Sequence, residues 1–574
     1  MFRIPKKPHR KPFPTGQKQH QKTVPGMADQ VSGSIAQPQT KSNDIFPGGG
    51  TGEGTSLEKR QPLSTSLAEN LAAIRNRTGE NSDLIIREFE VFLYKIRAAV
   101  IYLDGLVNNE LVHVHVLRGL MAGSAAMRVS EQEEAPECGE MRGTQEVCLQ
   151  GEDAFKAIKD KLLSVAGAGE ISTVDQAVLA FHSADAVFLL DGYSQGLVLA
   201  VRGFPVRGIA EPGTENMIRG PREGFVEGLR INTALLRRRL RDPNFKMISM
   251  RLGRRTHTDC VLAYVQDLVD PDLLSEVQQR LANIDCDLIL ESGNIEQLIE
   301  DSWLSPFPQV QSTERPDKVI AAVLEGRVAI LVDGTPFALL VPATFLQFFQ
   351  AGEDYYERWL IASVVRMLRI FASYVATFTP ALYVAVLSFH PGLLPTNLAL
   401  AVAATREGIP FPAVVEALIM EVAFELFREA GARLPGPIGQ TVGIVGGLIV
   451  GEAAVAANLA SPGMVIVVAL TALAGFSIPA YNMAIGFRLV RFPLTILAAT
   501  LGLYGVMLGF IIINIHMVSL RSFGVTYLSP LAPYRFRDWK DILIRAPARA
   551  MVTRPAITRA RQPKRENSDK PEGW

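Results

Sequence analysis

The chain has 574 residues, 48% of them hydrophobic, and its 58 Lys and Arg balance its 58 Asp and Glu. This length allows a membrane domain together with one or two further domains. The basic charge gathers at the ends: residues 1–25 hold seven Lys or Arg and no acid, and the segment after His516 holds twelve against five acids. Such ends suit anionic lipid headgroups, and beside membrane spans they argue against a nucleic-acid partner.

Residues 1–82 are rich in Pro, Gly, Gln, Ser and Lys, as in the run Pro47-Gly48-Gly49-Gly50. A segment of this composition buries too little apolar surface to offset the entropy lost on ordering the chain. We therefore expect a disordered basic extension here. No apolar signal segment precedes the first apolar span, so we expect the part before that span to stay on the cytoplasmic side.

Three apolar runs then end in Asp-Gly, at 99–105, 186–192 and 328–334. Asp-Gly accepts the positive φ of tight turns, and β-branched or aliphatic runs before it are typical of strands. The second run continues into 196–202 and the third into 336–341, as returning strands would. Turn chemistry accounts for the three aspartates better than a ligand site does.

Helical patterns lie between these strands, for example at 271–284 and 294–301. The mixture predicts an α+β or α/β cytoplasmic domain pair. A polar stretch near 129–170 suggests the boundary, so we expect a first subdomain over 83–165 and a second over 166–354.

The segment 230–255 is strongly basic and includes Arg237, Arg238 and Arg239. A solvated helix face followed by a strand is one interpretation. A contact with a neighbouring subunit or with lipid headgroups is the other, and we favour the contact. Aromatic side chains do not alternate with the arginines, which argues against single-stranded nucleic acid.

Four long apolar runs follow, at 370–390, 441–460, 463–487 and 492–515. A helix needs about 20 such residues to cross a hydrocarbon core about 30 Å thick. Arg366 and Arg369 precede the first run, as suits a cytoplasmic flank. We predict an α-helical multi-span membrane domain over 355–516, followed by a basic C-terminal tail over 517–574.

The segment 413–430 is a different kind of helix. Glu421, Glu425 and Arg428 fall on one face, and the uninterrupted apolar length is too short to span. The helix lies in the interface, enters the membrane as a re-entrant element, or crosses with its charges turned toward protein or water. We favour the interfacial or re-entrant helix, which leaves four spans and returns the tail to the cytoplasmic side. A crossing helix would place the tail outside.

The run 441–460 holds the strongest candidates for function. Gly443, Gly447 and Gly451 recur every fourth residue and form a smooth face, which allows close helix packing. Glu452 is the single charge of this run, and an ionisable group inside a membrane is costly unless it faces a partner or water. We predict a cation path or gate here. A structural Glu bonded to Asn458 or Asn482 is the competing interpretation.

Motifs of familiar catalytic and cofactor sites are missing from the sequence. It has no GxxxxGK[ST] loop, no GxGxxG after a strand, no HExxH and no nucleophile elbow. The four cysteines, Cys138, Cys148, Cys260 and Cys286, form no CxxC pair and no zinc-like cluster with histidine, which indicates reduced thiols. We therefore expect that the protein is not an enzyme and that it binds neither a metal ion nor a cofactor.

Motifs spread between Asp83 and Pro555 resemble, as a set, the A subunit of the GerA-type spore germinant receptors of endospore-forming bacteria. They are Gly220–Glu227, Asn232–Leu240, Ser305–Gln309, Arg315–Asp317, Glu325–Ala338, Glu353–Arg358, Arg428–Pro435, Gly443–Gly451 and Ser522–Gly524. The basic first 80 residues lie outside the pattern.

The resemblance implies a subunit of a receptor in the spore inner membrane. It would work with a transporter-like B subunit and a lipoprotein C subunit, and nutrients such as amino acids or sugars would trigger ion release. In this family the A subunit is thought to form a ring-shaped homo-oligomer that acts as a nutrient-gated ion channel, while the B subunit senses the germinant. The expected partners are therefore further copies of the chain, the B and C subunits, membrane lipid and cations.

Two alternatives stay open. A related spore membrane protein, SpoVAF, shares the A-subunit fold, so the resemblance also fits a SpoVAF-like accessory protein. A non-conducting scaffold that assembles receptor partners fits as well. A secondary transporter is a weaker alternative, because it requires more spans and an internal inverted repeat.

Overall fold

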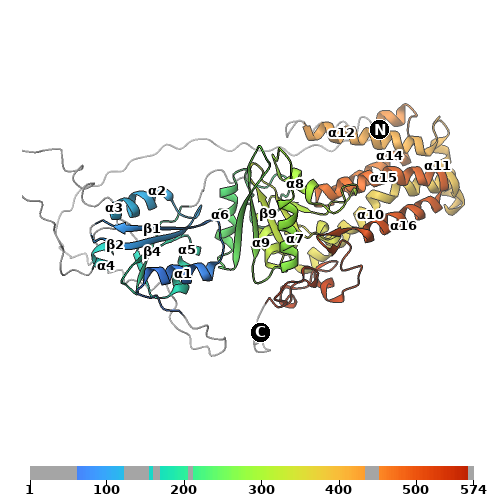
Figure 1. Ribbon diagram of the computed structural model, residues 1–574. Coiled ribbons are helices and arrows are strands. Elements are labelled where there is room, and N and C mark those ends of the chain that lie inside the picture. Colours follow the sequence, from blue (N-terminus) through green and yellow to red (C-terminus); the bar gives the residue numbers. More distant parts are fainter. Residues whose placement is uncertain are drawn as a thin grey trace, which may run out of the picture. The chain divides into compact units, whose positions relative to one another are not determined.

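The computed structural model describes residues 61–92, 94–121, 154–159, 168–203, 211–433 and 451–565 (Figure 1). Of the extension predicted over 1–82, the first 60 residues lie outside this description. The remainder is not disordered, because α1 (Leu67–Thr78) is a helix with Leu67, Leu71 and Ile74 buried. The prediction was wrong there because these three residues recur at helical spacing and give the helix an apolar face.

The first sheet has five strands in the order β1-β2-β4-β5-β3, and every neighbouring pair is antiparallel. They are β1 (Leu84–Val91), β2 (Ile96–Leu103), β3 (Ala168–Ile171), β4 (Ala186–Leu190) and β5 (Gly196–Leu199). Helices α1 and α5 (Val174–His182) pack on one face (Figure 1). The other face is covered by α2 (Asn109–Leu111), the π-helix η1 (Val112–Leu117), α3 (Arg118–Met121) and α4 (Ala154–Ala157).

The second sheet repeats this order as β6-β7-β9-β10-β8, again antiparallel throughout. Its strands are β6 (Phe245–Leu252), β7 (Thr258–Val265), β8 (Gln311–Thr313), β9 (Val328–Val332) and β10 (Ala338–Val341). Helices α6 (Leu229–Arg239) and α9 (Pro316–Leu324) cover one face. Helices α7 (Pro271–Ala282) and α8 (Ser292–Ile299) cover the other (Figure 1).

The boundary predicted between 83–165 and 166–354 is wrong. Strands β1 and β2 precede that point, β3 to β5 follow it, and all five form one sheet. The two sheet domains therefore divide between β5 and α6. A polar loop within a domain and a linker between domains have the same composition, so the stretch at 129–170 did not reveal which of the two it was.

The two predicted hairpins are confirmed. β4 pairs with β5 and β9 with β10, each across an Asp-Gly turn. Gly192 and Gly334 both have φ +86°, which glycine adopts without the steric cost that a Cβ would bring. The carboxylates of the turns also bond a helix start: Asp191 accepts from Leu67 N at 2.8 Å, and Asp333 accepts from Leu229 N at 3.0 Å. Asp191 and Asp333 thus stabilise both their own turn and the start of a neighbouring helix.

A buried asparagine occupies the same place in both domains. Asn70 Oδ1 accepts from Ser64 N at 2.7 Å and its Nδ2 donates to Ser64 O at 2.6 Å. Asn232 makes the corresponding pair with Val226, at 2.9 and 2.6 Å. Shared strand order, shared turns and shared side-chain bonds identify the two sheet domains as tandem repeats of one unit.

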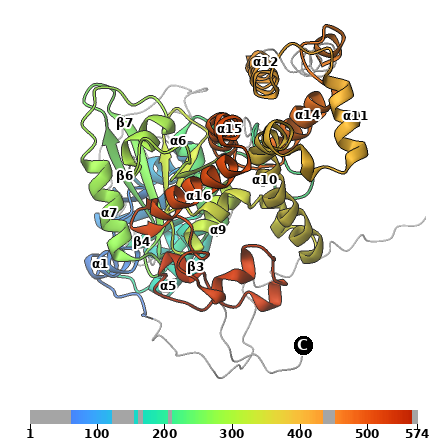
Figure 2. The same cartoon turned by 90° about the vertical axis from the view of Figure 1, so that its right-hand side faces the viewer.

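The helical part begins after two 3-10 turns, η4 (Phe345–Phe349) and η5 (Gly352–Tyr355). Its helices are α10 (Trp359–Phe389), α11 (Thr396–Arg406), α12 (Ala413–Arg433), α14 (Pro462–Phe476), α15 (Tyr481–Leu501) and α16 (Leu503–Ser519), with the 3-10 turn η6 (Pro391–Leu393) after α10. Among the described residues, α10 and α15 are long and apolar enough to cross a membrane, while α14 and α16 are apolar but shorter. α10 lies beside α14, α15 and α16 (Figures 1 and 2).

The span predicted at 463–487 is wrong, because it is two helices. The first ends at Phe476 and the next begins at Tyr481. Pro479 lies between them; it lacks an N–H and disfavours helical geometry in the residue before it. An unbroken apolar composition therefore concealed a turn.

The span predicted at 492–515 is also divided. Gly502 has φ +62°, ends α15 and precedes the first residue of α16. The run 370–390 lies almost wholly within α10, which begins eleven residues earlier and continues through Pro380. For 441–460 the structure describes only the second half, which is helical over 451–456.

The C-terminal segment is folded against the second sheet domain. Ser522 Oγ donates to Gln309 O at 2.7 Å, and Thr558 Oγ1 donates to Glu325 O at 2.5 Å. Phe523 belongs to the apolar cluster on the face that α7 and α8 cover. The elements of the C-terminal segment are β11 (Arg521–Ser522), β12 (Val525–Thr526), η7 (Phe536–Asp541), η8 (Ala548–Ala550) and η9 (Ala556–Thr558). The described part of the tail and the second sheet domain therefore lie at the same end of the helical part.

Candidate functional site

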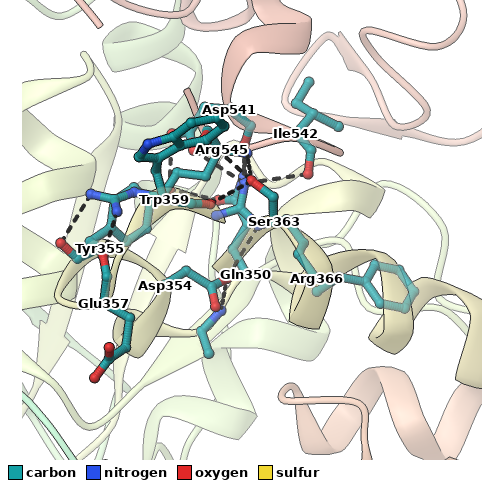
Figure 3. Close-up of polar contacts among 12 residues, drawn as sticks. Gln350, Asp354, Tyr355, Glu357, Trp359, Ser363, Arg366, Asp541, Ile542 and Arg545 are labelled. Atoms are coloured by element: carbon teal, nitrogen blue, oxygen red, sulfur yellow. Dashed lines mark hydrogen bonds and ion pairs between the residues drawn. The ribbon is translucent and has the colours of Figure 1, made fainter. Parts of the chain in front are cut away.

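A buried ion-pair cluster joins the second sheet domain, the start of α10 and the C-terminal segment (Figure 3). Arg366 is completely buried; its Nε lies 3.2 Å from Asp354 Oδ2, and its Nη1 lies 3.2 Å from Asp541 Oδ1. Arg369 Nη1 lies 2.8 Å from Asp354 Oδ1. Buried charges require partners of opposite sign, and each of these has one.

Further hydrogen bonds hold the C-terminal segment against the same helix (Figure 3). Ser363 Oγ accepts from Arg545 N at 3.0 Å. The Arg545 guanidinium donates to Glu357 O at 2.8 Å and to Tyr355 O at 3.1 Å. Tyr355 OH donates to Asp541 Oδ2 at 3.0 Å. Movement of the sheet domain relative to α10 would have to break several of these bonds.

Sequence reasoning identified Arg366 and Arg369 as a flank of an apolar run but missed their partners. Asp354 lies twelve residues before Arg366, and Asp541 lies in a tail that we had treated as basic. The available signal was the position of two arginines on successive turns of a helix that is otherwise apolar. Such residues are paired when buried.

Helix α12 turns its charges toward α15. Glu421 Oε1 lies 3.5 Å from Arg491 Nε, and the two side chains are 0% and 5% exposed. Glu425 lies 3.2 Å from Arg488 and 3.4 Å from Arg491, and it also pairs with Arg428 at 2.7 Å. The three predicted residues do share a face, but that face meets another helix. The charges are thus turned toward protein. The choice among an interfacial, a re-entrant and a crossing helix stays a prediction.

A third acid of α12, Glu416, fixes the opposite end of the helical part. Glu416 is completely buried, and its Oε2 accepts from both N and Oγ of Ser461 at 3.0 Å. Arg406 Nη2 donates to Glu416 Oε1 at 2.7 Å. Tyr383 of α10 lies 3.4 Å from Ser461 Oγ. The Glu416 carboxylate thus binds residues of two other segments, and Ser461 extends the cluster to α10.

Glu452 and Gly451 are the predicted pore residues that the structure describes, and Gly443 and Gly447 lie outside the described residues. Gly451 is buried and Glu452 is exposed. Both line a hollow of about 1120 Å³ whose other walls are mainly apolar residues of α12 and α14, such as Phe424 and Leu473. No hydrogen bond or ion pair joins Glu452 to another described residue, including Asn458 and Asn482.

The three arginines proposed as subunit contacts behave differently from one another. Arg237 is 1% exposed and makes two hydrogen bonds to Asp83, of 2.7 and 2.9 Å, which join the two sheet domains. The prediction is wrong for Arg237, because a buried side chain offers no surface to a neighbour. Arg238 and Arg239 remain partly exposed and share Glu223. For them a subunit contact stays a prediction.

Among the described residues no group of three or more His, Cys, Asp or Glu is arranged to hold a metal ion. Cys260 is buried and Cys286 is partly exposed, and both are free thiols. Burial raises the pKa of the Cys260 thiol to about 12, which makes it unreactive at neutral pH.

A family of sequences described as "Bacillus/Clostridium GerA spore germination protein" matches residues 72–557. The match covers most of the chain, so the chain belongs to this family. It is a spore germination protein of the A-subunit type.

Individual relatives agree. Spore germination protein KA of Bacillus subtilis is 44% identical over 89% of this chain and 90% of its own length. GerLA of Bacillus cereus is 41% identical over 87% and 97%. The uncharacterized membrane protein YfkQ of Bacillus subtilis is 45% identical over 87% and 93%. A crystal structure of the N-terminal domain of the A subunit of the Bacillus megaterium receptor GerK3 is 32% identical, covering 50% of this chain and 99% of that one, with a TM-score of 0.38.

Proposed function

We propose that this chain is the A subunit of a nutrient-germinant receptor in the spore inner membrane, with its sheet domains in the cytoplasm. Family membership and the relatives named as germination proteins support this. The long apolar helices α10 and α15 supply spans. The C-terminal segment packs on the second sheet domain, which supports an even number of membrane crossings on this proposal.

The subunit works, on this proposal, with a transporter-like B subunit and a lipoprotein C subunit. Several A subunits form a ring around a cation path that opens when a nutrient is sensed. The observation that carries the proposal is Glu452, an exposed carboxylate without a partner among the described residues, in a mainly apolar hollow that Arg428 also lines. An acid so placed is costly in lipid and concentrates cations beside water.

A second candidate is a non-conducting or SpoVAF-like accessory protein that assembles partners. The paired charges of α12 and α15 favour it, because ion pairs that fix one helix against another also serve a scaffold. The two candidates differ in what a charge-removing change at Glu452 does.

Spores that carry Glu452→Gln test the proposal, with Glu429→Gln as the control because Glu429 is 63% exposed and pairs with Arg433 on the same helix. Potassium release is measured after addition of a mixture of amino acids and sugars, and protein level by immunoblot. We expect slower release in Glu452→Gln and normal release in the control. Normal release at normal abundance in both would favour the scaffold. A protein that stays monomeric in every detergent would remove the ring.

A further inference from the structure

Arg327 is a buried cation that forms no ion pair with a carboxylate of the described residues. It stands directly before β9 and is 4% exposed. Its Nη1 donates to Gln311 Oε1 at 2.9 Å and its Nη2 to Leu340 O at 3.3 Å, while its Nε has no hydrogen-bond partner among the described residues. Within the described part of the chain no carboxylate lies within ion-pair distance of it. A buried guanidinium ordinarily has such a partner, because an unpaired charge costs several kcal/mol to bury.

A cavity of about 510 Å³ lies against this arginine. Its walls come from α9, from the linker that includes η4 and η5, and from the C-terminal residues 554–565. The volume falls within the range of small-molecule sites. Polar groups gather in it, including the side chains of Gln347, Gln350 and Tyr356.

The charges that line the cavity are unequal. Four are cationic and two are anionic, namely Lys318, Arg327, Arg554 and Arg565 against Asp317 and Glu325. Arg565 already pairs with Glu325 at 2.5 Å, and Lys318 pairs with Glu215 outside the cavity. The surplus therefore suits an occupant with one or two negative charges.

The first sheet domain shows that the fold does not require an unpaired charge at this position. Asp185 stands directly before β4 as Arg327 stands before β9. Its carboxylate accepts two hydrogen bonds from Arg202, at 2.7 and 2.8 Å. In the first domain, Asp185 is therefore paired within the chain. In the second domain, Arg327 at the corresponding position lines a cavity.

We propose that this cavity binds a small anion, with a carboxylate or phosphate group against the guanidinium of Arg327. Guanidinium and such oxyanions form strong charge-assisted hydrogen bonds. The group belongs either to a free metabolite or to an anionic lipid headgroup, which have the same chemistry at this point. This inference is independent of the proposed receptor function, since binding is measured on the purified chain.

The cavity adjoins the joint between the sheet domain and α10. Gln350 lines it and donates through Nε2 to Asp541 O at 2.7 Å, and Tyr355 lines it and donates to Asp541 Oδ2 at 3.0 Å. Asp541 is also a partner of Arg366 (Figure 3). A bound anion therefore stabilises the residues that hold the first long helix.

Equilibrium binding of radiolabelled succinate and of inorganic phosphate to the full chain in detergent tests the proposal. Two variants address the cavity separately. Arg327→Gln removes the cation, and Ala321→Trp fills the cavity from an exposed position of α9, so we expect this variant to fold. Arg251→Gln is the control, because Arg251 is 74% exposed and lies outside the cavity.

We expect at least one probe to bind, and both cavity variants to weaken it about tenfold or more, as the loss of a charge-assisted contact does. The control should bind as the unmodified chain does. Competition by phosphatidylglycerol micelles but not by phosphatidylcholine micelles would assign the site to a lipid headgroup, and no competition would assign it to a free anion.

Two results would overturn the proposal. One is that neither probe nor phosphatidylglycerol binds up to about 10 mM. The other is that Ala321→Trp melts at the same temperature as the unmodified chain and still binds the probe equally well. The second result would overturn the proposal even if the Arg327→Gln variant does not fold.

Discussion

In both sheet domains a charged residue stands between a helix and the strand that follows it. In the first domain this is Asp185, whose partner Arg202 has a side chain that is 58% exposed. In the second it is Arg327, which the linker and the C-terminal segment enclose. The backbone at the two places is alike, so the difference lies in what covers it. The position is occupied by a buried carboxylate with an exposed arginine partner in one copy and lines a cavity in the other.

The same contrast holds for the domains as wholes. Each has helices on both faces of its sheet. The second additionally receives Phe523 and Ser522 from the C-terminal segment and connects through Asp354 to α10. The two sheet domains share one fold. Contacts from outside the repeated unit connect only the second domain to the described helices of the helical part.

The largest expected effect on stability comes from breaking the buried ion pairs of Arg366, which connect α10 to Asp354 and Asp541. Arg366→Met removes a completely buried cation and leaves Asp354 and Asp541 without it. Breaking a buried pair costs about 3–5 kcal/mol, so we expect a large fall in melting temperature or loss of the protein from the membrane. Arg254→Met is the control, because Arg254 is 64% exposed, and it should change stability by less than about 0.5 kcal/mol. Equal effects would mean that the connection adds no stability.

A smaller effect concerns the pH dependence of stability, in which the two sheet domains should differ. His182 ends α5, where the second domain has Leu324, and burial followed by the charges of Arg237 and Lys246 lowers the pKa of His182 to about 3. The unfolded chain takes up a proton near pH 6.5 and the folded chain does not, so stability falls as pH drops below 6.5. The group contributes about 2 kcal/mol of that loss between pH 6.5 and 5.

His182→Leu copies the residue of the second repeat and should flatten this dependence. Denaturant unfolding of the full chain in detergent between pH 7 and 5 measures it, with His257→Leu as an exposed control in the second domain. An unchanged slope in His182→Leu would show that the folded protein protonates this imidazole.

The smallest effect tests the duplication itself. Asn70→Ala and Asn232→Ala each remove two hydrogen bonds of matching geometry to a neighbouring backbone. We expect each to lower the free energy of unfolding by about 1–3 kcal/mol, and the two values to agree within about 0.5 kcal/mol. Hydrogen exchange of the two helix starts measures each loss locally. A large inequality would mean that the repeats have diverged in how they hold these helices.

Much of this architecture was predictable because its signals are local. The Asp-Gly turns gave both hairpins, and the apolar composition gave the helical part. The motifs between Asp83 and Pro555 gave the family, which the match over 72–557 confirms. Errors arose where composition has two interpretations: Pro479 and Gly502 divide runs that looked continuous, and a polar loop looked like a boundary.

By itself the sequence determined the kinds of element and the family, because strand, turn and apolar helix depend on residues near one another in the chain. Tertiary structure alone decided which charges are paired. Glu425 finds Arg488, and Asp541 finds Arg366, across more than sixty residues. Arg327 forms no ion pair with a carboxylate in the described part of the chain. Pairing in a low-dielectric interior depends on distances of a few ångströms between distant segments, and a linear pattern carries no such distances.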